Sequence, residues 1–124
     1  MRLAHVARRV LAWERAARAR VDLTLLDAAA MRRLNRRATG RRALTDVISF
    51  ALPQPGGGLV GDVYICPQAA EPRGGSRAEE LVRLAVHGTL HVLGYDHPGG
   101  PGRTRSAMWR RQERYVRRLL NGGR

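Results

Sequence analysis

Apolar residues recur at helical spacing near both ends of the chain. From Leu3 onward they fall three or four positions apart with arginines between them, which is typical of an amphipathic helix. The apolar positions of this first helix are Val6, Ala7, Val10, Trp13 and Ala17. Residues 105–120 predict a last helix, whose inward side consists of Met108, Gln112, Tyr115, Val116 and Leu119. His5 is expected at the surface or at the edge of the core.

The most apolar helix is predicted after residue 76. Ser76 and Glu79 have the spacing of a capping box, in which the two side chains satisfy backbone groups at the start of a helix. The apolar residues that follow cover most of the helix surface, so we expect it to be central and buried: Leu81, Val82, Leu84, Ala85, Val86 and Leu90.

Three short segments, 21–26, 47–52 and 61–66, have the alternation or the β-branched residues of strands. Asp27 is expected to cap a short helix through Asn35, with Met31 and Leu34 inward. The second and third strands are expected to pair across a Gly/Pro-rich turn, and residues 67–75 and 98–102 are predicted connections. The predicted fold class is α+β, with a mixed sheet of three to four strands, four to five helices and one domain over residues 1–124.

Composition adds a strong positive charge. The chain has 23 arginines, no lysine and 10 acidic residues, a net charge of +13 that attracts polyanions such as nucleic acid. The absence of lysine also indicates a general bias toward arginine, so a plain solvated surface stays an alternative for part of this charge. No apolar run approaches the roughly 20 residues that cross a bilayer. We therefore expect a cytoplasmic protein without a membrane partner, with an organellar transit peptide as the alternative for the arginine-rich start.

Cys66 is the only cysteine, which excludes an internal disulfide and predicts a buried apolar residue in a reducing compartment.

Residues 36–44 are predicted to form a polar loop with four arginines around Gly40, namely Arg36, Arg37, Arg41 and Arg42. Guanidinium forks match phosphate oxygens, so this loop is a candidate phosphate clamp. A solvated loop is the competing interpretation.

Three of the four histidines lie within residues 87–97. His87 and His91 are four positions apart and share one face of a helix. Gly94 allows a left-handed helix end, after which the returning chain can bring His97 to the same point. Three imidazoles suit one catalytic zinc per chain, because they leave a coordination position for a water molecule that becomes the catalytic group. A structural metal and a metal-free histidine core are the alternatives, and Asp96 either orients an imidazole or is a turn residue.

The His-x3-His-x5-His spacing also occurs in metzincin proteases, which carry a general-base Glu directly after the first histidine. Gly88 occupies that position and cannot move a proton, so peptide hydrolysis is disfavoured. A metal that acts on a phosphodiester agrees better with the basic composition.

Residues 87–97, His-Gly-Thr-Leu-His-Val-Leu-Gly-Tyr-Asp-His, resemble the signature of the YbeY family of bacterial endoribonucleases, also called rRNA maturation factors. Leu34-Asn35, residues 45–50 and residues 61–65 follow the order and spacing of the family's other motifs, and the resemblance extends to Met108 and Glu113. It implies zinc bound by His87, His91 and His97. It also implies cleavage of single-stranded RNA in rRNA maturation and ribosome quality control, with the ribosome or ribosomal proteins as partners.

Two features depart from the family pattern. The family's helper arginine, in a Tyr-Arg pair, is replaced by Ala38 and Thr39, so we hypothesise that Arg41 or Arg42 contacts phosphate instead. The family's N-terminal strand has no counterpart before Leu3, which predicts a sheet one strand smaller. Because of Thr39, a non-catalytic RNA- or ribosome-binding assembly factor with a retained metal site is the alternative function.

Overall fold

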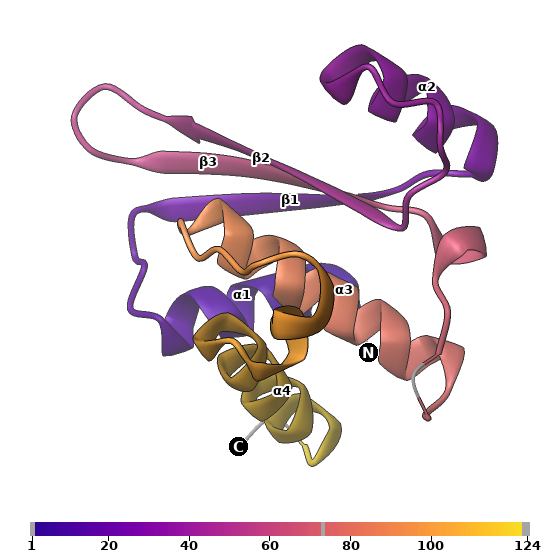
Figure 1. Cartoon of the computed structure of the whole chain (residues 1–124). Helices are drawn as coiled ribbons and strands as arrows, with labels where there is room; N and C mark the ends of the chain where they lie inside the picture. The colour runs from indigo at the N-terminus through magenta and orange to yellow at the C-terminus, as the bar shows by residue number, and fades with distance from the viewer. Residues whose placement is uncertain (1, 73, 123–124) are drawn as a thin grey trace.

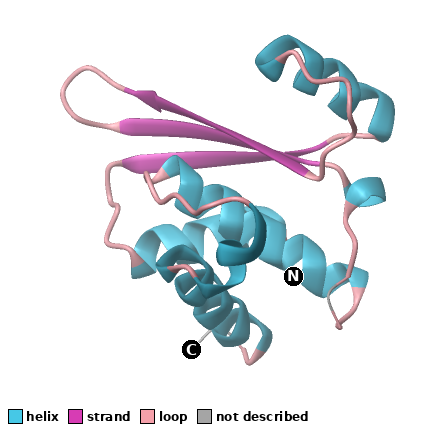
Figure 2. Ribbon diagram, in the orientation of Figure 1, coloured by secondary structure: helices cyan, strands magenta, loops and turns pink. Residues whose placement is uncertain are grey.

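The computed structural model describes residues 2–72 and 74–122. In chain order, the elements are α1 (Leu3–Trp13), β1 (Ala19–Leu25), α2 (Ala28–Thr39), β2 (Val47–Pro53), β3 (Leu59–Ile65), α3 (Arg77–Val92) and α4 (Ala107–Leu120). Short 3-10 turns cover Pro67–Ala69 and Gly100–Arg105. Figure 1 shows the chain from end to end, and Figure 2 separates its helices from its strands. The predicted α+β class is confirmed.

The three strands form one mixed sheet in the order β1-β3-β2. β2 and β3 pair antiparallel, with Val47 opposite Ile65, and this confirms the predicted pairing of the second and third strands. β1 runs parallel to β3, with Leu23 opposite Val63. β3 is therefore the central strand, and its side chains have neighbours on both β1 and β2.

One face of the sheet carries the core. α1 packs on β1, and α3 packs on β2 and β3, while α4 packs on α3 (Figure 1). Along β3 the residues at alternate positions, Gly61, Val63 and Ile65, are buried, as expected for the strand face turned toward helices. α3 is the central helix, since it contacts α1, α4 and all three strands. In Figure 1, α2 lies apart from these helices, past the end of the strands.

Two glycines allow α3 to approach the sheet closely. A Cβ atom at Gly88 of α3 would lie 2.5 Å from Cγ1 of Val63 and 3.0 Å from Oγ of Ser49. A Cβ atom at Gly61 of β3 would lie 2.3 Å from Cγ1 of Val92. All three distances are shorter than van der Waals contact, so any larger residue would push the helix and the sheet apart. Gly88 sits directly after the first histidine of the cluster, and this close packing fixes where the cluster lies.

The helix ends differ from the predictions in three places. α1 ends at Trp13 and excludes Ala17, because Arg15 adopts a left-handed backbone with φ 56°. α2 continues beyond Asn35 to Thr39, so the prediction of Arg36 and Arg37 in a loop is wrong; arginine is a good helix former, and basic residues favour a helix C-terminus. The predicted loop 98–102 partly becomes the 3-10 turn that precedes α4.

Most of the predicted core is confirmed, whereas Trp13, Leu34 and Leu81 are only half-buried. All five residues assigned to the inward side of the last helix are buried, as are Cys66 and Met31, and His5 is exposed. Ser76 accepts a hydrogen bond from the Glu79 backbone and starts α3 as predicted. Arg73, in the predicted connection 67–75, lies outside the described residues. No helix in the described part of the chain has both the length and the apolar character to span a membrane.

Candidate metal centre

Three imidazoles converge at the C-terminal part of α3. His87 and His91 project from the helix, and His97 follows the turn at Gly94, whose φ of 100° needs a residue without a side chain. One nitrogen from each ring can be chosen so that all three lie within 4.8 Å of one another. The ring centroids are 4.5 Å apart for His87 and His91, and 5.1 Å apart for the other two pairs.

The second nitrogen of each ring is already engaged. Nδ1 of His91 lies 2.9 Å from the carbonyl oxygen of Tyr95, and Nδ1 of His97 lies 3.0 Å from that of Pro98. Nδ1 of His87 lies 2.6 Å from the side-chain oxygen of Gln112 on α4. A carbonyl oxygen only accepts, so each Nδ1 carries the proton and each Nε2 keeps a lone pair. The three imidazoles are therefore all in the tautomer that binds a metal through Nε2.

The orientation of the Gln112 amide is set by the hydrogen bond that its nitrogen donates. Its Nε2 donates to Glu113 at 2.9 Å, which turns the amide oxygen toward His87. Glu113 in turn accepts two bonds from Arg83, at 2.8 and 3.0 Å, and Arg83 also donates to the buried Glu80 at 2.9 Å. This chain of charged hydrogen bonds joins α3 to α4 and determines the protonated nitrogen of His87.

Glu14, directly after α1, fixes the turn that follows His91. Tyr95 donates to Glu14 at 2.6 Å, and Tyr115 and Arg111 donate to its second carboxylate oxygen. Burial by itself raises the pKa of Glu14, but these hydrogen bonds outweigh it and the pKa is lowered. The turn that carries the Tyr95 carbonyl to His91 is therefore restrained by Glu14 at the end of α1 and, through Glu14, by Tyr115 and Arg111 of α4.

Burial favours the neutral form of His87 and His91. His87 is 6% exposed, and the loss of solvation lowers its pKa to about 4 even though the bond to Gln112 opposes the change. Burial also lowers the pKa of His91, with the neighbouring His97 adding to the effect. Both rings are thus unprotonated at neutral pH, the form that binds metals. Three histidine nitrogens in one place fit zinc and the other borderline divalent ions.

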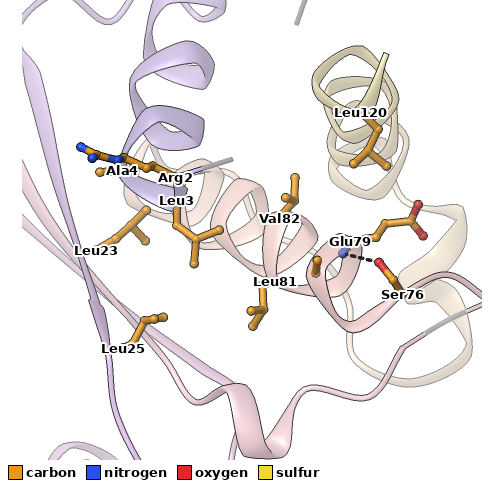
Figure 3. A pocket seen from close by; sticks show the side chains of 11 residues that line it. Arg2, Leu3, Ala4, Leu23, Leu25, Ser76, Glu79, Leu81, Val82 and Leu120 are labelled. Atoms are coloured by element: carbon orange, nitrogen blue, oxygen red, sulfur yellow. Dashed lines mark hydrogen bonds between the residues drawn. The ribbon is translucent and has the colours of Figure 1, made fainter. Parts of the chain in front are cut away.

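The cluster opens into a pocket of about 390 Å³ between α3 and β2. His87 and His91 line it together with Val47, Ser49 and Ala51, so a ligand atom can approach the imidazoles from the sheet side. A larger hollow of about 730 Å³ lies at the other end of α3 (Figure 3). Five of its eleven lining residues are leucines, from α1, β1, α3 and α4, and none of the described residues that line it is a histidine or a cysteine. The candidate chemistry therefore belongs to the smaller pocket.

The other predicted site residues lie in different surroundings. Arg41 and Arg42 are exposed in the segment between α2 and β2, six and five positions before the pocket-lining Val47. Asp96 is a turn residue in the structure, because its carboxylate accepts from the backbone N–H of His97 at 2.9 Å. Thr39, at the position of the family arginine, donates through its hydroxyl to Asn35.

Sequence patterns did not indicate the roles of Gln112, Ser49 or Arg103. Gln112 was predicted only as an inward residue of the last helix, although an amide on an otherwise apolar side is itself a signal of a buried hydrogen bond. Ser49 lies in the predicted second strand and borders the pocket. Arg103 lies in the 3-10 turn after His97, and its positive charge contributes to the lowered pKa of both His87 and His91, after burial as the main cause.

Comparison with known proteins gives one consistent family. A family model described as endoribonuclease YbeY matches residues 2–120. Curated relatives called endoribonuclease YbeY include those of Moorella thermoacetica, 46% identical over 102 residues, and Pelotomaculum thermopropionicum, 44% identical over 112 residues. The relative from Mycolicibacterium smegmatis is 40% identical over 94 residues.

The matches cover 70%, 82% and 64% of this chain but 65%, 72% and 53% of the respective relatives. The chain therefore spans about half to three quarters of the length of these curated proteins. A Thermotoga maritima protein with a structure determined in solution aligns over 96% of this chain and 81% of its own, with a TM-score of 0.63 and 24% identity. That likeness supports the fold.

Proposed function

Since the chain belongs to the endoribonuclease YbeY family, we propose that it is a zinc-dependent endoribonuclease that cuts single-stranded RNA. The observation that carries this proposal is the common tautomer of the three histidines. Each Nδ1 donates to a protein oxygen and each Nε2 is left with a lone pair, and His87 and His91 also line an open pocket. A histidine cluster that served only the core would have no need of three free acceptors in one place.

Zinc bound by three neutral imidazoles lowers the pKa of a coordinated water toward about 7 and stabilises negative charge that develops on phosphate oxygens. His87, His91 and His97 would bind the ion. Gln112 and the Tyr95 carbonyl orient two of the rings, and the pocket between α3 and β2 admits the sugar-phosphate backbone. Gly88 offers no base for peptide hydrolysis, which agrees with a phosphodiester as the bond that is cut.

The RNA-binding surface is proposed to include the segment after α2. Arg41 and Arg42 are exposed there, and α2 exposes Arg32, Arg33, Arg36 and Arg37. Guanidinium groups bind phosphate through paired hydrogen bonds without reading base sequence. We propose that Arg41 or Arg42 contacts the phosphate backbone as it enters the pocket.

The proposed biological role is maturation of ribosomal RNA and ribosome quality control, carried out in the cytoplasm by one domain over residues 1–124. Precursor rRNA would be the substrate, and the ribosome or its proteins the partners. The net charge of +13 supports a polyanionic partner.

A second candidate, a non-catalytic RNA- or ribosome-binding assembly factor, is favoured by Thr39. The residue stands where the family has an arginine, and its hydroxyl is used in a hydrogen bond to Asn35 within α2. In that case the metal site would serve the fold, and RNA would be bound but not cut.

Incubation of the purified protein with a fluorescent single-stranded RNA separates the two functions. If the protein is the proposed enzyme, we expect it to cut the RNA. A chelator should abolish this cleavage, added zinc should restore it, and His87→Ala should eliminate it. His5→Ala is the matched control, because His5 is exposed on α1 and outside the cluster. RNA binding without cuts, equal in the wild type and in His87→Ala, would instead support the assembly factor.

A further inference from the structure

β1 is an edge strand of the sheet. It pairs with β3 on one side, and no described segment pairs with its other side. Two hydrogen bonds just outside β1 identify the backbone groups that face β3. The carbonyl oxygen of Arg18 accepts from the N–H of Leu59, and the N–H of Leu26 donates to the carbonyl of Ile65. In a strand with one neighbour, residues that bond to it alternate with residues whose N–H and C=O point outward.

The outward backbone groups of β1 belong to its apolar residues. The register with β3 is continuous, so the residues that bond to β3 lie an even number of positions from both Arg18 and Leu26, namely Arg20, Asp22 and Thr24. The residues that direct their N–H and C=O groups to the open edge are Val21, Leu23 and Leu25. No other described residue forms a backbone hydrogen bond with the outward groups of these three. An extended chain can pair with such an open row.

The larger hollow of Figure 3 continues from this edge. Leu23 and Leu25 line it from β1, and Leu81 of α3 and Leu120 of α4 line it from the helices. Leu25 is 56% exposed and Leu120 is 44% exposed, so two of the three exposed large apolar side chains in the described part of the chain line one hollow. Side chains on one face of an added strand would stand beside those of Leu23 and Leu25 and enter this hollow.

The charges around the edge favour an acidic occupant. Arg2 lines the hollow, lies on the side of Leu23 in Figure 3, and forms no ion pair with a described acidic residue. Glu79 is the acidic residue among the described lining residues, and it lies 4.0 Å from Arg83. Arg20 is exposed on the other face of β1. A second copy of a chain with a net charge of +13 would be repelled, whereas carboxylates would be attracted.

We propose that the open edge of β1 and the adjoining hollow bind an extended acidic segment of a partner protein as an added strand of the sheet. The outward groups of β1 supply backbone hydrogen bonds, and the hollow takes the apolar side chains on one face of the segment. Carboxylates of the segment pair with Arg2 at the hollow and with Arg20 on the opposite face. The histidine pocket lies at the other end of α3, so this inference does not depend on the proposed function.

The probe is a fluorescent synthetic peptide of strand length in which Glu alternates with Leu or Val, and fluorescence anisotropy measures its affinity. Leu25→Ser should weaken binding about tenfold, because an apolar contact of the hollow is lost. Leu52→Ser is the matched control, since Leu52 is 54% exposed on β2, the other edge strand. This control should change the affinity less than about threefold. Circular dichroism shows that both variants are folded.

Two altered peptides separate the parts of the proposed contact. A fully N-methylated peptide keeps every side chain but donates no backbone hydrogen bond, so it should not bind. A peptide with Lys in place of Glu should bind at least about tenfold more weakly, because it meets Arg2 and Arg20 with like charge. Equal affinity of all three peptides would overturn the inference, as would the absence of saturable binding of the Glu peptide by the wild type.

Amide hydrogen exchange locates the peptide on β1. The N–H groups of Val21, Leu23 and Leu25 should exchange at least about tenfold more slowly in the complex, because they gain an acceptor. The control amides, which should change little, are those already bonded to β3 at Arg20, Asp22 and Thr24. Equal changes in both sets would overturn the inference. Dimerisation of the peptide-free protein that Leu25→Ser abolishes and Leu52→Ser preserves would also overturn it, and would assign the edge to a second copy.

Discussion

The side-chain oxygen of Gln112 lies 2.6 Å from Nδ1 of His87, so α4, which contributes no histidine to the cluster, sets which nitrogen of a candidate metal ligand is protonated. The amide cannot rotate to offer its nitrogen without losing its bond to Glu113, which is itself paired with Arg83. Packing of α4 on α3 is therefore part of the candidate metal centre.

Replacement of Gln112 by Leu should weaken metal binding by about 10- to 100-fold, the usual effect of losing a partner of a ligating histidine. The buried Nδ1–H of His87 would be left without an acceptor. Competition with a chromophoric chelator measures the change. Arg114→Gln, exposed on the same helix, is the control and should bind metal like the wild type. Equal affinity of Gln112→Leu and the control would show that Gln112 does not orient His87.

Glu14→Gln should reduce the free energy of unfolding by about 2–3 kcal/mol, because Tyr95, Tyr115 and Arg111 all donate to this largely buried carboxylate. Metal affinity should also fall, since Tyr95 loses the bond that restrains the turn after His91. Urea denaturation and metal competition measure the two effects. Glu71→Gln, at an exposed carboxylate, should alter neither. A stable Glu14→Gln protein with unchanged metal affinity would contradict the role assigned to Glu14.

The metal-free protein should lose stability on acidification from pH 7 to pH 5. In the unfolded chain the histidine pKa is about 6.5, whereas burial lowers that of His87 to about 4 in the folded chain and also lowers that of His91. The unfolded state binds more protons in this window, so stability falls as pH falls, by about 2 kcal/mol from His87 alone. Urea denaturation in chelator at several pH values tests this. His87→Gln should show a shallower dependence, and an equal slope would assign the effect to other groups.

Gly88→Ala should destabilise the fold by about 1–3 kcal/mol, because the new methyl group would lie 2.5 Å from Cγ1 of Val63. Val63→Ala should restore part of that loss in the double variant, even though it is destabilising on its own. A double-mutant cycle in urea gives the coupling. Additive effects of the two substitutions would mean that Gly88 and Val63 do not limit the approach of α3.

Simultaneous replacement of Arg41 and Arg42 by Ala should weaken binding of single-stranded RNA and reduce the salt dependence of that binding, while metal affinity stays constant. Fluorescence anisotropy at several salt concentrations measures the slope. Replacement of Arg8 and Arg9, on α1, removes the same charge from another element and serves as the control. Unchanged RNA cleavage by the Arg41/Arg42 variant would reject a contact of these residues with substrate.

Local patterns predicted the parts of the site that one helix and its following turn contain. The spacing of His87 and His91 and the capping pair Ser76 and Glu79 depend on helix geometry, which repeats along the sequence. Gln112 and Arg103 depend on how α4 packs on α3, and no spacing rule connects residue 112 to residue 87. The parallel pairing of β1 with β3 is equally non-local, since two other elements intervene. Sequence patterns do not predict that α2 extends to Thr39, because the arginines of this segment suit both a helix and a solvated loop.

The contact between Gly88 and Val63 also limits how this chain could evolve. A carboxylate base after the first histidine is the one residue that would bring the motif to the metzincin pattern. A Glu at position 88 would meet Val63 and Ser49 before its carboxylate came near the metal ligands. A change from the proposed phosphodiester chemistry to peptide hydrolysis would therefore need coordinated changes in α3 and in the sheet.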